Sequence, residues 1–191
     1  MEILKYLKQS MDTPWKAVNE GLMIIFKIPA FFYTKILCGV EIGSKFKFYG
    51  LPRIFKYRGS EIKIGNRFED RNWFFSNPLA VAHPTIICTW KENAKIKIGN
   101  DVGISGGSIV AAKKIEIGSG TLIGVNTTII DTDFHPLESS TRRYLKRGVK
   151  SKPVKIGTNV FIGMNCIILK GVEIPDNAIV PAGSVIRKWG R

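Results

Sequence analysis

A six-residue repeat of aliphatic side chains decides what this chain can fold into. From Ile156 to Ile186 an aliphatic residue returns at every sixth position without interruption, as Ile156, Ile162, Ile168, Ile174, Val180 and Ile186. This period matches neither the 3.6-residue period of a helix nor the two-residue alternation of a strand. It is typical of a parallel β-helix, in which each hexapeptide makes one short strand and one corner. Three hexapeptides close a triangular coil of about 18 residues, and stacked coils enclose an apolar interior.

The same step is present upstream, with interruptions. It starts after Val40 and restarts at Ile62, and the pattern is weak from Phe68 to Lys95, where we expect part of the segment to be loop or irregular coil. A one-residue slip before Ile117 predicts an insertion at a corner. The expected inward residues of these coils are Ile42, Phe48, Ile54, Ile64, Ile98, Ile104, Val110, Ile117, Ile123 and Ile129. The sequence therefore predicts an all-β β-helix domain over residues 40–191.

The repeat breaks at residues 131–136 and resumes at Val154. More residues separate Ile129 from Ile156 than one coil needs, so a loop over residues 137–153 is expected to leave the prism. Its basic residues are Arg142, Arg143, Lys146, Arg147, Lys150 and Lys152. Three interpretations of the basic stretch 142–152 stay open: it covers the cleft of a neighbouring subunit and attracts an anionic acceptor, it faces a membrane, or it is a solvated loop.

Residues 1–39 are predicted to form a helical extension. Ile3, Leu4 and Leu7 follow a helical spacing, and Asp12-Thr13-Pro14 is a start signal for a further helix. Two interpretations stay open here as well. The extension packs on the prism and shields its open edge, or residues 1–35, rich in aromatic side chains and lysines, make a peripheral contact with the inner membrane leaflet.

Composition limits the cellular compartments and the classes of binding partner that can be expected for this protein. The formal net charge of +14 points to nucleic acid, an anionic membrane or phosphorylated small molecules. The chain has no zinc-finger spacing, basic zipper helix or RNA-binding aromatic platform, so no nucleic-acid partner is expected. Cys38, Cys88 and Cys166 form no close pair, and no signal peptide is recognisable, so we expect a cytoplasmic protein with reduced thiols.

The repeat together with Asp131-Thr132-Asp133-Phe134-His135-Pro136 resembles the hexapeptide-repeat acyltransferases, and within them the branch that O-acetylates sugars and polysaccharides. The resemblance covers roughly residues 40–188. It implies a left-handed parallel β-helix, an exception to the usual right-handed crossover, and a homotrimer with active sites between subunits. It also implies acetyl-CoA as co-substrate and a carbohydrate acceptor. The function expected from it is O-acetylation of a sugar hydroxyl, in surface polysaccharide or lipid-linked oligosaccharide biosynthesis.

Acyl transfer to a hydroxyl needs a general base, and histidine titrates closest to neutral pH. The chain has two histidines, His83 and His135, and the motif match assigns His135 as the base. In an extended segment Asp133 shares its face, where it would orient His135 or contact the acceptor. Asp131 is a weaker candidate for the acceptor.

The remaining site residues follow from the resemblance. Ser105 and Gly106 fall one coil before His135, where related sugar acetyltransferases present an asparagine, so this chain departs from the family's acceptor contact. His83 either lines the same cleft or is structural. The residues matched to the coenzyme site are Phe161 as an apolar wall, Gly163, Met164, Ala182, Gly183 and Ser184 at corners, and Arg187 and Lys188 for the phosphates.

Three alternatives compete with O-acetylation. N-acetylation of an amino sugar would use the same scaffold and base. A γ-carbonic anhydrase type of zinc enzyme needs three histidine ligands, and this chain has two histidines, so no metal is expected. A non-catalytic scaffold or membrane-recruitment module would bind no coenzyme A.

Overall fold

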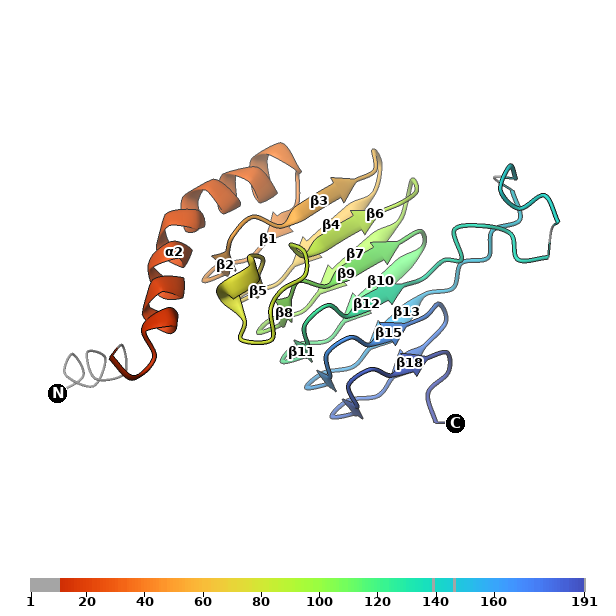
Figure 1. The fold of residues 1–191 in the computed structure, drawn as a ribbon. Helices are drawn as coiled ribbons and strands as arrows, with labels where there is room; N and C mark the ends of the chain where they lie inside the picture. Colours follow the sequence, from red (N-terminus) through yellow and green to blue (C-terminus); the bar gives the residue numbers. More distant parts are fainter. Residues whose placement is uncertain (1–10, 139, 146, 191) are drawn as a thin grey trace.

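The computed structural model describes residues 11–138, 140–145 and 147–190. Within them, short parallel strands form three six-stranded sheets that make the faces of a prism (Figure 1). Sheet A contains β1 (Glu41–Ile42), β4 (Glu61–Ile64), β7 (Lys95–Ile98), β10 (Lys114–Ile117), β13 (Val154–Ile156) and β16 (Glu173–Ile174). Sheet B contains β2 (Lys47–Tyr49), β5 (Glu69–Arg71), β8 (Gly103–Ser105), β11 (Leu122–Ile123), β14 (Phe161–Ile162) and β17 (Ile179–Val180). Sheet C contains β3 (Arg53–Lys56), β6 (Ile86–Thr89), β9 (Ser108–Ala111), β12 (Thr128–Ile130), β15 (Ile167–Ile168) and β18 (Val185–Ile186).

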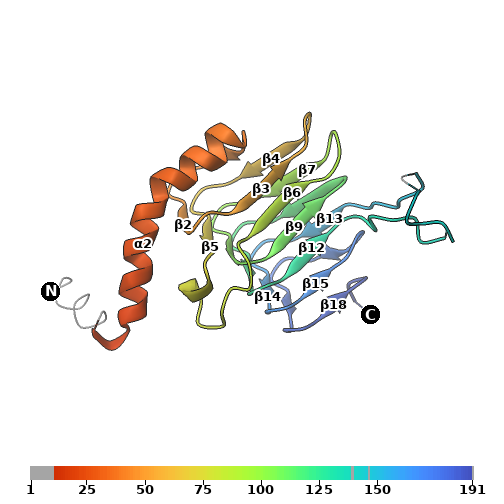
Figure 2. The ribbon, with the colours of Figure 1, turned by 45° about the horizontal axis from the view of Figure 1, so that its top comes forward.

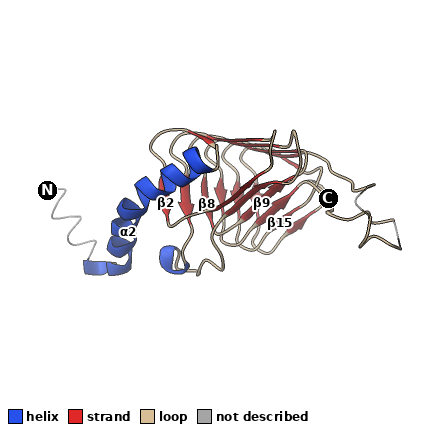
Figure 3. Cartoon of the chain, turned by 90° about the horizontal axis from the view of Figure 1, so that it is seen from above, coloured by secondary structure: helices blue, strands red, loops and turns tan. Residues whose placement is uncertain are grey.

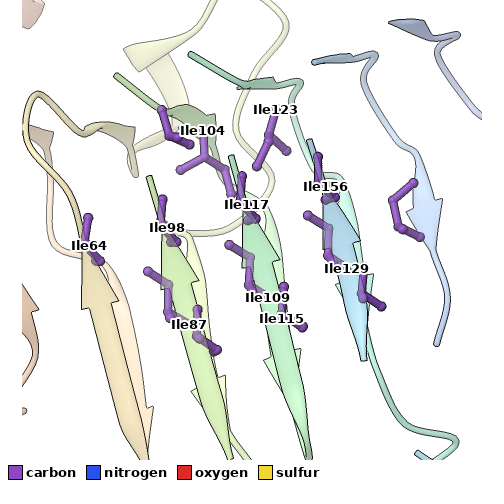
Figure 4. Packing of buried hydrophobic residues seen from close by; sticks show 14 of the residues in the cluster. Ile64, Ile87, Ile98, Ile104, Ile109, Ile115, Ile117, Ile123, Ile129 and Ile156 are labelled. Atoms are coloured by element: carbon purple, nitrogen blue, oxygen red, sulfur yellow. The ribbon is translucent and has the colours of Figure 1, made fainter. Parts of the chain in front are cut away.

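Each coil contributes one strand to each sheet, and the repeat places equivalent side chains above one another. In sheet A the register aligns Ile64, Ile98, Ile117 and Ile156, which Figure 4 shows pointing into the interior. All four are buried. Burying an isoleucine contributes about 2 kcal/mol, so the ladders are the main source of stability. The predicted left-handed parallel β-helix is thus confirmed as the fold class.

One predicted inward residue is wrong. Ile109, not Val110, is buried, and it lies in register with Ile87 and Ile129. The coil is one residue shorter than the hexapeptide step at Gly106-Gly107, where Gly106 adopts a left-handed φ of 53°. The following corner, between Ile109 and Ile117, is two residues longer than the step of six, which gives the net one-residue slip before Ile117.

An acid replaces an aliphatic residue in the ladder of sheet B. Asp70 lies in register between Phe48 and Ile104 and is fully buried, which explains the weak pattern after Phe68. Its Oδ1 accepts a hydrogen bond from Thr85 Oγ1 at 2.5 Å, whereas its Oδ2 is buried with no hydrogen-bond partner among the described residues. Asn72 Oδ1 accepts from the Thr85 backbone N–H at 2.7 Å. Together these contacts close the base of a loop over residues 72–85.

The ionisation of Asp70 makes stability depend on pH. Burial raises the pKa of Asp70 to about 7. Because the folded-state pKa exceeds the unfolded one, the folded state binds the extra proton, and stability is lost as pH rises from about 4 to about 7. Between about pH 5 and about pH 8 this loss is about 3 kcal/mol. We expect Asp70→Asn to lack that loss, as measured by urea unfolding at both pH values; equal pH dependence in both proteins would contradict it.

The N-terminal helix packs on the first coil. Helix α2 (Pro14–Phe31) begins at the proline that the sequence predicts, and a π-helical turn, η1 (Phe32–Leu37), leads into β1. Asn19 is buried and accepts from Trp73 Nε1 at 3.0 Å, and Phe31 stacks on Phe46 at 5.5 Å between ring centroids. Figures 2 and 3 show α2 lying across the end of the prism beside β2. The predicted shielding of the open end is therefore present, while the predicted helix over Ile3–Met11 falls almost entirely outside the described residues.

Two loops leave the prism at different edges. The loop over residues 72–85, which contains the short helix η2 (Phe74–Ser76), connects sheet B to sheet C. The loop over residues 131–153 connects β12 of sheet C to β13 of sheet A and includes the predicted loop 137–153. In Figure 1 the second loop projects far from the stack, on the side away from α2.

Candidate active site

The base of the 131–153 loop holds the motif segment in place. Thr132 and Ser151 form an antiparallel bridge, and their hydroxyl oxygens lie 2.9 Å apart. The backbone N–H of Asp133 donates to the carbonyl of Lys150 at 3.1 Å, and that of Lys152 to the carbonyl of Asp131 at 2.9 Å. The two ends of the loop are thus paired, and the segment before His135 is fixed to the prism.

A strained turn presents His135. Its backbone N–H donates to the carbonyl of Asp133 at 2.7 Å, and Phe134 between them has a φ of 60°. This is a γ-turn with positive φ, a conformation that is costly for a bulky residue and clusters at functional sites. The Phe134 ring meets the Trp90 ring edge-on, with centroids 5.7 Å apart, and this contact offsets part of the strain.

The His135 side chain is exposed, and its Nδ1 lies 3.4 Å from the carbonyl oxygen of Arg142. With the proton on Nδ1, the ring donates to that carbonyl and Nε2 keeps a lone pair for a substrate proton. The extruded loop therefore supplies a contact that favours the tautomer a general base needs.

Asp133 is held by a lysine that the sequence analysis did not identify. Lys170 Nζ lies 2.6 Å from Asp133 Oδ1, and both side chains are largely buried, with 24% and 14% of their surface exposed. Lys170 lies at the corner between β15 and β16, one coil beyond the motif. Asp133 Oδ2 is buried with no hydrogen-bond partner among the described residues, so this oxygen keeps an unused acceptor position.

We expect Lys170→Met to lower the free energy of unfolding by about 2 kcal/mol, because it leaves a largely buried carboxylate without its cation. Asp133→Asn removes that charge, so the double variant Lys170→Met with Asp133→Asn should lose less than the sum of the two single changes. Urea unfolding of the four proteins measures the coupling. Additive losses would show that the pair contributes no interaction energy.

Asp131 has a structural environment. It is fully buried, and its carboxylate accepts from the backbone N–H groups of Ala112, Lys113 and Lys114 at 2.6, 2.7 and 2.6 Å. Burial raises the pKa of Asp131, against the opposing effect of these N–H donors. The carboxylate joins the corner of one coil to the next and presents no free oxygen to a substrate.

The expected acceptor residues gather at the corner between sheets B and C. Ser105 is nearly buried, and its Oγ accepts from Asn77 Nδ2 at 3.2 Å. A Cβ on Gly106 would meet the Val81 side chain and the His83 carbonyl, so glycine is needed for the 72–85 loop to pack there. His83 Nδ1 lies 2.9 Å from the carbonyl of Pro84. The structure brings Ser105, Gly106 and His83 together, at a different corner from His135.

A hollow of about 330 Å³ on the outer face of sheet B joins two of the expected binding residues. Ser105 and Phe161 both line it, with Arg67, Arg71 and Leu122. Phe161 is half exposed and stands in register with Leu122 and Ile179, which are also more than half exposed, and the three make an apolar column. Such a surface suits a long apolar arm, with polar groups at one end.

The corners next to this column contain small residues, and the structure explains each one differently. A Cβ on Gly163 would overlap the backbone of Ala182, so coil stacking requires that glycine. Gly183 has a φ of 74° and open space where a Cβ would point, so a ligand has room to approach its backbone. Met164 lies at the same corner as Gly163, while Arg187 and Lys188 follow β18 and are exposed.

An aromatic hollow beside the motif was not predicted. It measures about 690 Å³ and is lined by Phe55, Tyr57, Cys88 and Trp90, among others. The three aromatic side chains are each more than half exposed, and Trp90 contacts Phe134. The sequence shows these aromatic residues, but it does not show that they lie side by side. Their proximity depends on the pairing of β3 with β6.

No group of three or more His, Cys, Asp or Glu side chains that could hold a metal ion occurs in the described part of the chain. His83 and His135 lie at different corners of the prism.

Comparison with known proteins relates part of the sequence to a repeat family. Residues 153–188 match the family described as hexapeptide repeat of succinyl-transferase. Galactoside O-acetyltransferase of Escherichia coli K12 is 39% identical over 82 residues, which cover 42% of this chain and 38% of that protein. The bifunctional protein GlmU of Campylobacter lari is 30% identical over 95% of this chain and 40% of its own length. The chain thus spans about two fifths of the length of the curated relatives it matches.

A solved structure shares the fold. AntD, an N-acyltransferase from Bacillus cereus, was crystallised as a mutant with dTDP-4-amino-4,6-dideoxyglucose and coenzyme A. The similarity covers 78% of this chain and 73% of that chain, with a TM-score of 0.54 and 18% sequence identity. At this identity the similarity supports the fold alone.

Proposed function

The chain carries the hexapeptide repeat of an acyltransferase family, and from this premise we propose that it is an acetyl-CoA-dependent O-acetyltransferase acting on a sugar hydroxyl. One observation carries the proposal: the hollow that joins Ser105 to Phe161 lies on sheet B, whereas His135 lies at the edge between sheets C and A. A complete site then requires His135 of one subunit to face the sheet B hollow of another. The named O-acetyltransferase relative supports this chemistry.

The proposed reaction uses His135 as general base. Nε2 takes the proton of the acceptor hydroxyl while the hydroxyl oxygen attacks the thioester carbonyl carbon, which forms a tetrahedral intermediate. Collapse of this intermediate breaks the carbon–sulfur bond, and the imidazolium returns the proton to the departing thiolate. Asp133, held by Lys170, orients His135 or accepts a hydrogen bond from the sugar through Oδ2.

Each substrate has a proposed surface. The pantetheine arm of acetyl-CoA runs along the Leu122, Phe161 and Ile179 column, past Gly163, Met164, Ala182 and Gly183, and Arg187 and Lys188 meet its phosphates. The acceptor sugar lies by Ser105, Gly106 and His83. The three subunits of the proposed homotrimer bring these surfaces to His135.

The acceptor belongs to surface polysaccharide or lipid-linked oligosaccharide biosynthesis in this proposal. The net charge of +14 and the basic stretch 142–152 suit an anionic, phosphate-linked acceptor. The reaction then takes place in the cytoplasm, with a peripheral contact through residues 1–35 at the inner face of the membrane.

A coupled assay tests the proposal. The full-length protein is incubated with acetyl-CoA and either p-nitrophenyl β-galactoside or glucosamine, and thiol release and acetylated products are measured. O-acetylation yields a product that mild alkali hydrolyses. An alkali-resistant amide on glucosamine alone would favour N-acetylation, and the absence of both coenzyme A binding by calorimetry and thiol release would contradict an acyltransferase.

A further inference from the structure

The outer face of α2 and η1 is a long apolar surface that the prism does not cover. Its large side chains are more than half exposed: Trp15 52%, Val18 56%, Ile25 66%, Ile28 78%, Phe32 53% and Ile36 58%. The spacing of three, four or seven residues puts them on one side of the helix. Monomeric soluble proteins rarely expose an apolar surface of this extent without a partner.

The opposite side of the helix is already occupied. Asn19 and Ala30 are buried against the prism, and Glu20 accepts from the Tyr49 hydroxyl at 2.6 Å. These contacts fix the rotation of α2, so its exposed side faces away from the first coil (Figure 3). The apolar side chains are therefore presented outward at the N-terminal end of the prism.

The surroundings of this face are basic. Residues 11–60 include eight Lys or Arg and three Asp or Glu. Three of these cations lie on α2 and η1 themselves and are exposed: Lys16, Lys27 and Lys35. One of the three acids, Glu20, is already hydrogen-bonded to Tyr49. An apolar stripe with a basic rim complements a lipid surface, in which anionic headgroups cover an apolar acyl region.

We propose that the outer face of α2 and η1 docks on an anionic lipid bilayer, with the helix lying in the plane of the interface. None of the helices among the described residues is long and apolar enough to cross a membrane. A two-fold pairing of this face with a second copy of the chain would bring the same cations against each other, and like charges would oppose that pairing. Anionic lipid neutralises the rim. The inference deepens the proposed peripheral contact through residues 1–35 by naming the docking face and the charge of the lipid, and it does not depend on the transfer chemistry.

Vesicle co-sedimentation with the full-length protein tests this docking. We expect binding to phosphatidylcholine vesicles with about 30% phosphatidylglycerol to be at least about tenfold tighter than to phosphatidylcholine alone, and to weaken as salt screens the rim. The double variant Ile25→Ser with Ile28→Ser should lose binding about tenfold or more, because it removes apolar area from the face. Ile179→Ser is a matched control, since Ile179 is 67% exposed and Ile25 66%, on a different face.

The outcomes separate the possible occupants. Wild-type binding to anionic vesicles that the double variant loses and Ile179→Ser keeps supports the proposal. Negligible wild-type binding, or equal binding by all three proteins, overturns it. Loss of a solution oligomer in the double variant, without vesicle binding by the wild type, would instead assign this face to contact between copies. Acetyl transfer to a soluble galactoside by the double variant should stay at the wild-type rate, which keeps this test separate from that of the proposed reaction.

Discussion

Replacement of His135 by Gln is expected to lower kcat for acetyl transfer by about a hundred- to ten-thousand-fold. Gln keeps a hydrogen-bonding group of similar length on the strained turn, but it cannot take a proton at neutral pH. Because the proposed coenzyme surface on sheet B lies on another face, we expect the affinity for coenzyme A to change less than about twofold. Thiol-release kinetics and calorimetry measure the two quantities.

The chain offers a matched control for this substitution. His83 is the other histidine, and it lies within the 72–85 loop with its ring beside the carbonyl of Pro84. His83→Gln should raise KM for the acceptor sugar, which is proposed to lie beside His83, but keep kcat within about threefold of the wild type because His83 takes no proton in the proposed reaction. Wild-type kcat in His135→Gln, or a loss in His83→Gln that matches it, would show that the base is misassigned.

Replacement of Asp131 by Ala is expected to lower the free energy of unfolding by about 4 kcal/mol. The change leaves the backbone N–H groups of Ala112, Lys113 and Lys114 without their acceptor at a largely buried corner. Each unsatisfied buried donor costs about 1–3 kcal/mol, and partial solvation of the corner reduces the sum. Urea unfolding monitored by circular dichroism gives the value.

Asp176→Ala is the control for Asp131→Ala. Asp176 Oδ1 also accepts a backbone N–H across a corner, from Thr158 at 2.7 Å, but Asp176 is exposed. Water can replace that contact, so the loss should stay below about 1 kcal/mol. Similar losses for Asp131→Ala and Asp176→Ala would contradict the role assigned to burial at the 131 corner.

The fold was predictable from the sequence because the repeat is local. Each hexapeptide carries its own strand, and an unbroken run such as Ile156 to Ile186 leaves the register no alternative. Prediction failed where one coil differs from the average. A fixed step of six puts Val110 inward, because it does not detect the short Gly106-Gly107 corner. The column of sheet B is not recognisable at Asp70, because an acid is buried there only through its contact with Thr85, across a loop.

The site was predictable only where a motif marks it. Residues 131–136 identify the turn at His135, but the partner of Asp133 is Lys170, at a sequence separation of 37. That contact arises from the stacking of coils, as does the convergence of Trp90 on Phe134. Counting repeats also puts Ser105 one coil before His135 without revealing that the two lie at different corners. The corner of the prism at which a residue lies depends on how many residues the preceding loops contain.

The central claim is that the site forms between subunits, and subunit complementation tests it directly. His135→Gln removes the base from one surface, and Ala182→Trp fills the coenzyme surface at an exposed corner. Each variant alone should be inactive. When the two are co-expressed and assemble at random, about a quarter of the interfaces in a trimer combine an intact His135 with an intact coenzyme surface, so about a quarter of wild-type activity should return. If mixed assemblies form, as tagged pull-down would show, and activity stays at the level of the single variants, the site lies within one subunit and the account is wrong.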